Sequence, residues 1–306
     1  MIPQPSALDI DLARVRRRCL DFAELGKPRV VMMILVTTAV GFYLGSRGAP
    51  DYLRLLPTLL GTGLAAAGTL ALNQYMERDV DARMRRTRNR PLPDGRLQPF
   101  EALLFGVITT AVGLTYLGVA VNALSACVTA TTAVSYLALY TPLKRRTPLC
   151  SVIGAIPGAL PPVTGWVAAR AGFGVEAWIL FAILFLWQLP HSLAIARLYR
   201  DDYASAGLRL LPVVEPDAKS TGRQVVTNCL ALVVVGLMPT LVGLTGPVYF
   251  VIALVLGLTY LAYGILFSIS PDGQSARQLL FASLLYLPAL LLVMAFDKLP
   301  YGGGWW

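Results

Sequence analysis

The chain has 306 residues, of which 56% are apolar and only 14% are charged, and its mean hydropathy is +0.63. A soluble domain carries nearer a quarter charged residues, so this composition excludes an ordinary soluble protein. Apolar runs long enough to cross a bilayer recur along the whole sequence. The four cysteines form no CxxC pair, so we expect neither a disulfide framework nor a thiolate metal site.

The first 28 residues are polar, and they lack the apolar core and cleavage site of a signal peptide. They are also too acidic for a mitochondrial presequence. We therefore expect a cytoplasmic N-terminal segment over 1–28, a single membrane domain over 29–297 and a short C-terminal tail over 298–306. A multi-pass protein of the bacterial inner (plasma) membrane is the simplest assignment.

Nine apolar segments predict an all-α, polytopic membrane protein with nine transmembrane helices. They cover approximately residues 29–46, 53–73, 101–118, 121–140, 150–169, 175–198, 224–245, 247–269 and 278–297. A cytoplasmic N-terminus places 22 of the 26 Lys and Arg residues on the cytoplasmic side. The positive-inside rule thus favours nine spans with a periplasmic C-terminus. The net charge of +9 then mainly reflects the orientation of the chain in the membrane. We expect contact with the lipid bilayer and no nucleic-acid binding.

The end of the second predicted helix carries an amide and two carboxylates at a four-residue spacing. Asn73, Glu77 and Asp81 would point within about 80° of one another on a regular helix, whereas Asp79 would point nearly opposite Asp81. Oxygen ligands on one face suit a hard cation such as Mg²⁺, which usually also keeps phosphate oxygens. The basic residues that follow suit the same phosphate. The pattern therefore predicts a metal–diphosphate site at a membrane surface.

A second polar run, Tyr140 to Thr147, leads into a segment rich in glycine and proline that ends at Trp166. Its prolines predict a broken helix within the membrane, which is tolerated only where the backbone is buried or lines a cavity. A kinked packing helix is the alternative. Lys144 and Arg145 could reach a diphosphate from a second direction.

The third run contains Trp187 and His191, the only histidine of the chain, next to a proline inside an apolar span. A lone histidine in such a place usually has a structural role. Asp201 and Asp202 follow at the cytoplasmic end of the same predicted helix. An even number of intervening spans places the two acidic clusters on one side, so they could face one another across a cavity.

These three runs resemble the UbiA-type intramembrane prenyltransferase superfamily, and within it the branch that farnesylates protohaem IX. The match extends from Lys27-Pro-Arg29 to Leu211-Pro212. The haem-using branch is indicated by Trp187-Gln-x-Pro-His191 and Asp202-Tyr-x-x-Ala-Gly207. The sequence departs from the family pattern at three positions: Glu77 stands for Asp, Ser192 for Phe and Leu210 for Met.

The resemblance implies nine helices around a central cavity and transfer of farnesyl from farnesyl diphosphate to a vinyl group of haem b. Water addition would give haem O and diphosphate, with Mg²⁺ as cofactor and haem b as substrate. Haem A synthase and oxidase assembly factors are further partner candidates. The implied metal ligands are Asn73, Glu77, Asp81 and Asp202, and Lys144 completes the catalytic set. The implied substrate-binding residues are Lys27, Arg29, Arg78, Arg86, Arg90, Tyr140, Arg145, Trp187, His191, Asp201 and Tyr203.

Two rival functions stay open. A prenyltransferase for a quinone precursor such as 4-hydroxybenzoate would share the first motif, but it would not need the run from Trp187 to His191. A secondary transporter also has broken helices and intramembrane polar groups. A transporter predicts acidic groups near the midplane, whereas the acidic clusters of this chain lie at helix ends beside arginines.

Overall fold

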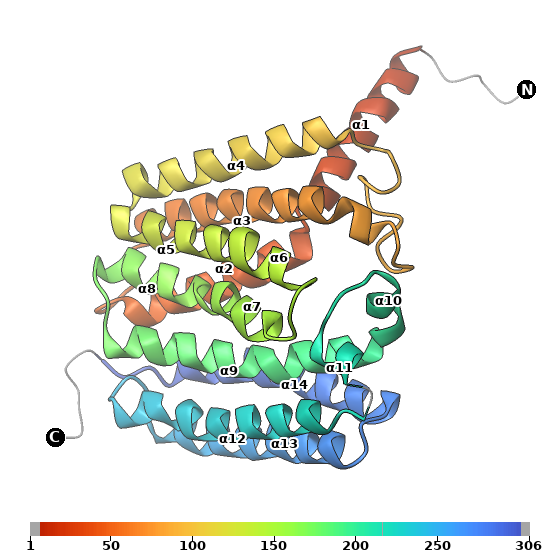
Figure 1. Ribbon diagram of the computed structural model, residues 1–306. Helices are drawn as coiled ribbons and strands as arrows, with labels where there is room; N and C mark the ends of the chain where they lie inside the picture. The colour runs from red at the N-terminus through yellow and green to blue at the C-terminus, as the bar shows by residue number, and fades with distance from the viewer. Residues whose placement is uncertain (1–6, 216, 301–306) are drawn as a thin grey trace, which may run out of the picture.

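The computed structural model describes residues 7–215 and 217–300, and the elements that it assigns over these residues are helices (Figure 1). Within this part of the chain, nine helical segments are long and apolar enough to cross a membrane, which confirms the predicted number. Residues 1–6 and 301–306, which belong to the expected N-terminal segment and C-terminal tail, lie outside the described residues.

Seven of the spans are continuous helices, and two are divided. The continuous helices are α2 (Pro28–Gly45), α3 (Tyr52–Asp81), α4 (Pro99–Ala120), α9 (Val175–Leu198), α12 (Lys219–Leu241), α13 (Pro247–Ile269) and α14 (Gly273–Phe296). The divided spans consist of α5 (Ala123–Val134), a π-helical segment (Ser135–Tyr140) and α6 (Thr141–Leu143), and of α7 (Cys150–Ala159) and α8 (Pro161–Arg170). Three further helices were not predicted: α1 (Ala7–Leu25), α10 (Arg200–Ser205) and α11 (Leu211–Val214).

Several helix ends follow from local sequence signals. Pro28 and Pro99 begin α2 and α4, where a missing N–H costs nothing. The side chain of Asp51 accepts a hydrogen bond from the backbone N–H of Arg54 at the start of α3. Asn122 caps α5 in the same way. The helix starts are thus fixed close to where the apolar segments begin.

The predicted break in the fifth span lies at Leu160, between α7 and α8. Glycines then let α8 approach α2 with backbone against backbone. A Cβ atom at Gly165 would lie 1.9 Å from the carbonyl oxygen of Thr38, and one at Gly41 would lie 2.0 Å from that of Pro162. The close contact fixes α2 against the broken span.

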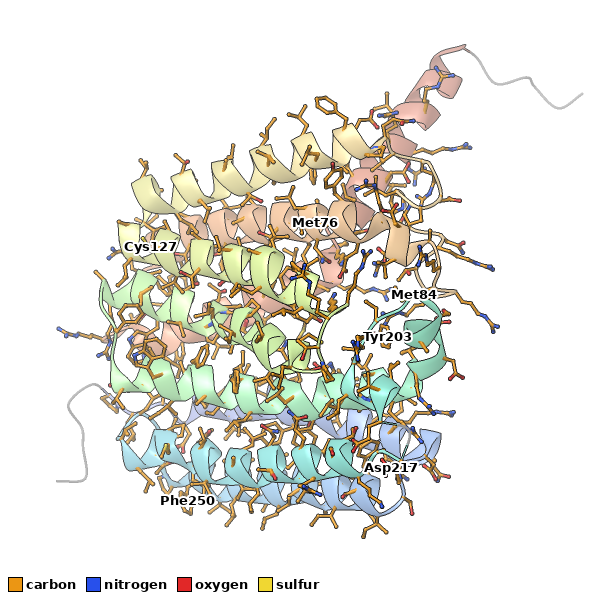
Figure 2. All side chains as sticks on the ribbon, viewed as in Figure 1. Met76, Met84, Cys127, Tyr203, Asp217 and Phe250 are labelled. Carbon is orange, nitrogen blue, oxygen red and sulfur yellow. The ribbon has the colours of Figure 1, made fainter. Side chains whose placement is uncertain are left out.

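The helices run side by side, with α3, α4 and α5 on one flank and α12, α13 and α14 on the other (Figure 1). Helix α9 lies between them and packs on α7, α12 and α14. The segment after α3 and helix α10 meet at one end of the bundle, where Figure 2 labels Met84 and Tyr203. Both acidic segments therefore lie at the same end, as the even number of spans predicted.

Candidate functional site

Asn73, Glu77 and Asp81 line a polar cavity of about 180 Å³ at the end of α3. The helix stays regular to Asp81, so the four-residue spacing keeps the three side chains on one face. Asn73 and Asp81 are each 1% exposed, and the Glu77 side chain is 13% exposed. Asp79 points to the surface, with its side chain 73% exposed beside Arg78. The three candidate ligands thus lie on one face of α3, and the solvated carboxylate of Asp79 lies on another.

The two carboxylates of the polar cavity are each paired with a basic side chain from another segment. The Lys144 ammonium lies 2.8 and 3.1 Å from the two Glu77 oxygens, and the Arg90 guanidinium donates to Asp81 at 2.6 Å. Burial lowers the pKa of Lys144, but its interactions with Tyr140 and Glu77 outweigh this and raise the pKa above the ordinary value. Lys144 is therefore held as a cation in the cavity wall.

A third basic side chain, Lys27, donates a hydrogen bond to the side-chain oxygen of Asn73 at 3.2 Å. Burial, with the nearby charges of Arg90 and Lys144, lowers the pKa of Lys27 to about 7. Lys27 is therefore only partly charged near neutral pH, and an anion bound beside it would favour its cationic form. Such a cavity suits a polyanionic ligand.

The π-helical segment brings Lys144 into the site. Thr141 donates to the backbone oxygen of Tyr136 at 2.9 Å and accepts a hydrogen bond from Asn73 at 3.1 Å. The Tyr136 hydroxyl lies 3.4 Å from the Asn73 oxygen. Isolated π-helical turns are frequent at functional sites because they reorient the side chains that follow. The sequence prediction missed Tyr136 and Thr141, although Tyr136 stands one turn before Tyr140 in the second polar run.

Arg86 joins the segment after α3 to helix α10. Its backbone N–H donates to Asp202 at 3.3 Å, and its guanidinium donates to the Tyr203 hydroxyl at 3.0 Å. The guanidinium also lies over the rings of Tyr199 and Tyr203, 4.8 and 5.4 Å from their centres. These contacts hold Arg86 and Tyr203 in the wall of the polar cavity.

The structure does not bring Asp202 into the group of expected metal ligands. Asp202 contacts Arg86 and is absent from the walls of both cavities of the site. Over residues 7–215 and 217–300, no three His, Cys, Asp or Glu side chains gather closely enough to hold a metal ion. The α3 face supplies an amide and two carboxylates, and Mg²⁺ commonly takes its other ligands from phosphate and water.

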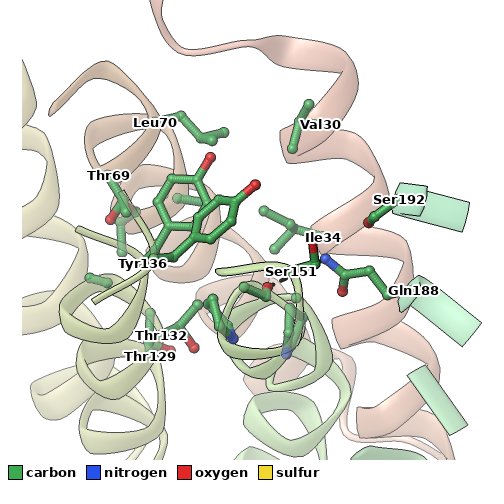
Figure 3. Close-up of a pocket in the computed structure, with 18 of the residues that line it drawn as sticks. Val30, Ile34, Thr69, Leu70, Thr129, Thr132, Tyr136, Ser151, Gln188 and Ser192 are labelled. Atoms are coloured by element: carbon green, nitrogen blue, oxygen red, sulfur yellow. Dashed lines mark hydrogen bonds between the residues drawn. The ribbon is translucent and has the colours of Figure 1, made fainter. Parts of the chain in front are cut away.

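A larger apolar cavity of about 410 Å³ continues from the polar one. The two cavities share five wall residues, namely Arg86, Tyr136, Tyr140, Tyr203 and Leu210. In Figure 3, Val30 and Ile34 of α2 lie across the space from Tyr136, and Gln188 and Ser192 project from α9. An elongated apolar ligand with an anionic head would fit this pair of cavities.

Two glycines of α7 shape the wall of the apolar cavity. A Cβ atom at Gly154 would lie 2.5 Å from the Tyr140 ring, and one at Gly158 would lie 1.9 Å from the Gln188 side-chain oxygen. The missing side chains let the ring and the amide lie against the helix. The glycines of the motif that follows Tyr140 thus shape the cavity wall and also allow close helix packing.

Trp187 and His191 lie on the neighbouring face of α9, directed at α14. The Trp187 indole donates to the Ser283 backbone oxygen at 2.8 Å, and His191 Nδ1 lies 2.8 Å from the Ser283 hydroxyl. The two rings stack with their centres 4.9 Å apart. Helical geometry places His191 about 60° around α9 from Gln188, which lines the cavity. The predicted pair therefore lies at the flank of the cavity and not in its wall.

Four other predicted residues also lie away from both cavities. Arg29, Arg145 and Asp201 are exposed at the surface. Arg78 turns back, donating to the Tyr75 carbonyl at 2.8 Å and lying over the Tyr75 ring. By contrast, the structure brings together a group of the predicted residues around the polar cavity. This group consists of Lys27, Asn73, Glu77, Asp81, Arg86, Arg90, Tyr140, Lys144 and Tyr203.

Sequence matches to known proteins cover nearly the whole chain. A protein named protoheme IX farnesyltransferase from Solibacter usitatus is 48% identical over 91% of this chain and 98% of its own length. The protein of the same name from Koribacter versatilis is 45% identical over 91% of this chain and 93% of its own.

Solved structures share the fold at low sequence identity. A digeranylgeranylglyceryl phosphate synthase has a TM-score of 0.78 at 17% identity, over 92% of this chain and 98% of the other. A UbiA homologue from Archaeoglobus fulgidus bound to GPP and Mg²⁺ has a TM-score of 0.62 at 18% identity, over 90% and 99% of the two chains.

The model of the UbiA prenyltransferase family matches residues 34–286, which include α3, the broken span and the cavity-lining part of α9. The chain is thus a multi-pass membrane enzyme that transfers prenyl groups, and it belongs to the UbiA prenyltransferase family.

Proposed function

We propose that this enzyme transfers farnesyl from farnesyl diphosphate to a vinyl group of haem b (protohaem IX), with addition of water, in a bacterial plasma membrane. The products would be haem O and diphosphate. The observation that carries the proposal is the continuity of the cation-lined polar cavity with the apolar cavity. The names of the relatives from Solibacter usitatus and Koribacter versatilis support haem as the acceptor.

The α3 face fits the Mg²⁺ ion that the reaction would need. Asn73, Glu77 and Asp81 offer hard oxygen ligands, and all three line the cavity where a diphosphate would be held. When bound, Mg²⁺ would neutralise negative charge on the leaving diphosphate. We propose this set without Asp202, which instead positions Arg86 through its backbone N–H.

The basic wall of the polar cavity would bind the diphosphate oxygens. Lys27, Arg86, Arg90 and Lys144 line it from three different segments. As the bond between farnesyl C1 and the diphosphate oxygen breaks, its electron pair leaves with the diphosphate. Negative charge therefore grows on the leaving group in the transition state, and fixed cations stabilise it more than they stabilise the substrate.

The apolar cavity would hold the farnesyl chain and protect the allylic cation. Tyr136 and Tyr140 lie where the two cavities join, so their aromatic faces can stabilise positive charge near C1. The vinyl π electrons form the new carbon–carbon bond, and the positive charge moves to the vinyl carbon beside the porphyrin. Water adds to that carbon and loses a proton, which completes the hydroxyl group of haem O.

The flank of the apolar cavity is the proposed haem contact. Trp187 and His191 lie there, adjacent to the cavity-lining Gln188 and Ser192 on α9. A neutral imidazole is a common ligand of haem iron. We propose that haem approaches from this flank, with one vinyl group directed into the cavity.

Incubation of the purified full-length protein with haem b, farnesyl diphosphate and Mg²⁺ tests the proposed function. Mass analysis of extracted porphyrins should show a haem that has gained one farnesyl and one hydroxyl group. An Asp79→Asn variant should behave like the unmodified protein, since that carboxylate is exposed. Prenylation of 4-hydroxybenzoate with no change in haem would instead support the quinone-precursor rival.

A further inference from the structure

Ser283 of α14 lies at the centre of a hydrogen-bond network that reaches α9. It is fully buried, in a helix that the recognised sequence motifs do not include. Its backbone oxygen accepts from Trp187, and its hydroxyl oxygen lies 2.8 Å from His191 Nδ1 and 2.6 Å from the Leu280 carbonyl oxygen. The network therefore joins both aromatic residues of the Trp187–His191 run to one serine.

The position of the single hydroxyl proton of Ser283 follows from these distances. Two oxygen atoms only 2.6 Å apart repel unless a proton lies between them, so the hydroxyl donates to the Leu280 carbonyl. The hydroxyl oxygen must then accept a hydrogen bond from His191, which places a proton on Nδ1. An imidazolium in an apolar span is costly, so the ring carries only this proton. The lone pair of Nε2 is left free.

We infer that Ser283 is a positioning residue that holds His191 in the tautomer whose Nε2 ligates the iron of the haem substrate. This inference rests on the proposed function, in which haem b is the acceptor. In the part of the chain that the structure describes, the hydrogen bond of His191 is the one through Nδ1. His191 is partly exposed and stands next to the cavity-lining Ser192.

The iron is the part of haem that a free Nε2 can bind. The haem propionates offer oxygen acceptors, and its vinyl and methyl groups offer no polar donor, so the lone pair would gain nothing from them. Ligand histidines commonly donate their other ring N–H to an oxygen partner, which fixes the tautomer and ring orientation. Ser283 supplies that partner, and stacking on Trp187 holds the ring plane.

The inference is tested with ferric haem added to purified full-length protein and its Ser283→Ala, Ser283→Cys and His191→Ala variants. Cysteine keeps the side-chain shape with a somewhat larger atom and is a weak acceptor, so Ser283→Cys leaves no cavity and guards against the packing defect of the alanine variant. Thr259→Ala is the matched control, because that hydroxyl donates only to the Val255 carbonyl of its own helix. The readouts are the Soret band, haem affinity and binding of farnesyl thiodiphosphate with Mg²⁺.

Loss of the Ser283 acceptor should shift the Soret band and weaken haem binding about 10–100-fold, the usual effect of removing a partner of a metal ligand. Binding of farnesyl thiodiphosphate and the properties of Thr259→Ala should not change. A shifted band in His191→Ala, with wild-type bands in both Ser283 variants, would overturn the positioning role and leave haem ligation intact. A wild-type band in His191→Ala would overturn the ligation itself. Transfer to 4-hydroxybenzoate without haem binding would instead remove the proposed function.

Discussion

The Lys144 ammonium lies 2.8 and 3.1 Å from the two carboxylate oxygens of Glu77, which is also a candidate ligand for Mg²⁺. The two side chains are 15% and 13% exposed, so water screens the pair only partly. The lysine therefore neutralises a carboxylate that Mg²⁺ would use. A diphosphate in the polar cavity can draw Lys144 away, so metal and diphosphate should bind cooperatively.

Replacement of Lys144 by methionine should therefore have opposite effects on the two ligands. Mn²⁺, used as a spectroscopic substitute for Mg²⁺, should bind the variant more tightly when added alone, because Glu77 loses its counter-ion. Farnesyl thiodiphosphate should bind more weakly, and the catalytic rate should fall about 10²–10³-fold, the scale for one electrostatic donor. Electron paramagnetic resonance and steady-state kinetics measure these effects.

Arg146→Met is the matched control for Lys144→Met, because Arg146 is exposed nearby and lines neither cavity. It should change neither metal affinity nor the rate. An unchanged Mn²⁺ affinity in Lys144→Met would show that the lysine does not restrain the carboxylate.

The Asp81→Asn substitution should abolish most of the turnover. It keeps the side-chain size but removes a buried charge that faces the cavity and accepts from Arg90. We expect the catalytic rate to fall more than about 100-fold at saturating Mg²⁺, with the far-ultraviolet circular dichroism unchanged. Asp79→Asn changes an exposed carboxylate of the same helix and serves as the control. Near-normal, Mg²⁺-dependent rates in Asp81→Asn would refute the metal role.

The helical period was sufficient to predict the α3 face of the site. Asn73, Glu77 and Asp81 share a face because their relation depends only on the turn per residue, and the helix continues regularly to its end. The nine spans were predictable for a similar reason, since length and hydropathy are properties of each segment alone.

Relations between segments could not be predicted in this way. Asp202 was expected opposite Asp81, but the path of the chain after α9 places it against the Arg86 backbone. His191 was identified as a notable residue, yet its partner Ser283 lies in an apolar helix without a sequence motif. The π-helical segment also escaped prediction, because its sequence is as apolar as an ordinary span.

Thr62 should control which prenyl diphosphate the apolar cavity accepts. It lines that cavity 11 residues before Asn73 on α3, which is about 16 Å of helical rise from the polar site. A Thr62→Phe substitution should fill the far end of the cavity. We expect the ratio of kcat/KM for farnesyl over geranyl diphosphate to fall about tenfold or more. Competition between the two donors, followed by mass analysis of the products, measures the ratio. An unchanged ratio would mean that the end of the farnesyl chain lies elsewhere.

Lys298 stabilises the opposite end of the bundle, where the chain leaves α14. Its ammonium donates to the carbonyl oxygens of Tyr43 and Ser46 at 2.6 and 2.7 Å and lies over the Tyr43 ring. These carbonyls lie at the C-terminal end of α2, so the lysine also complements the helix dipole.

The Lys298→Met substitution should lower the free energy of unfolding by about 1–3 kcal/mol, because charged hydrogen bonds are lost and the α2 carbonyls are left without that donor. The melting temperature in detergent should fall by a few degrees, whereas KM for farnesyl diphosphate should stay unchanged, since Lys298 lines neither cavity. Lys219→Met is the control, because the Lys219 side chain is 80% exposed beside Asp217 and should contribute little. A changed KM with an unchanged melting temperature in Lys298→Met would mean that this end of the bundle communicates with the site instead of stabilising the fold.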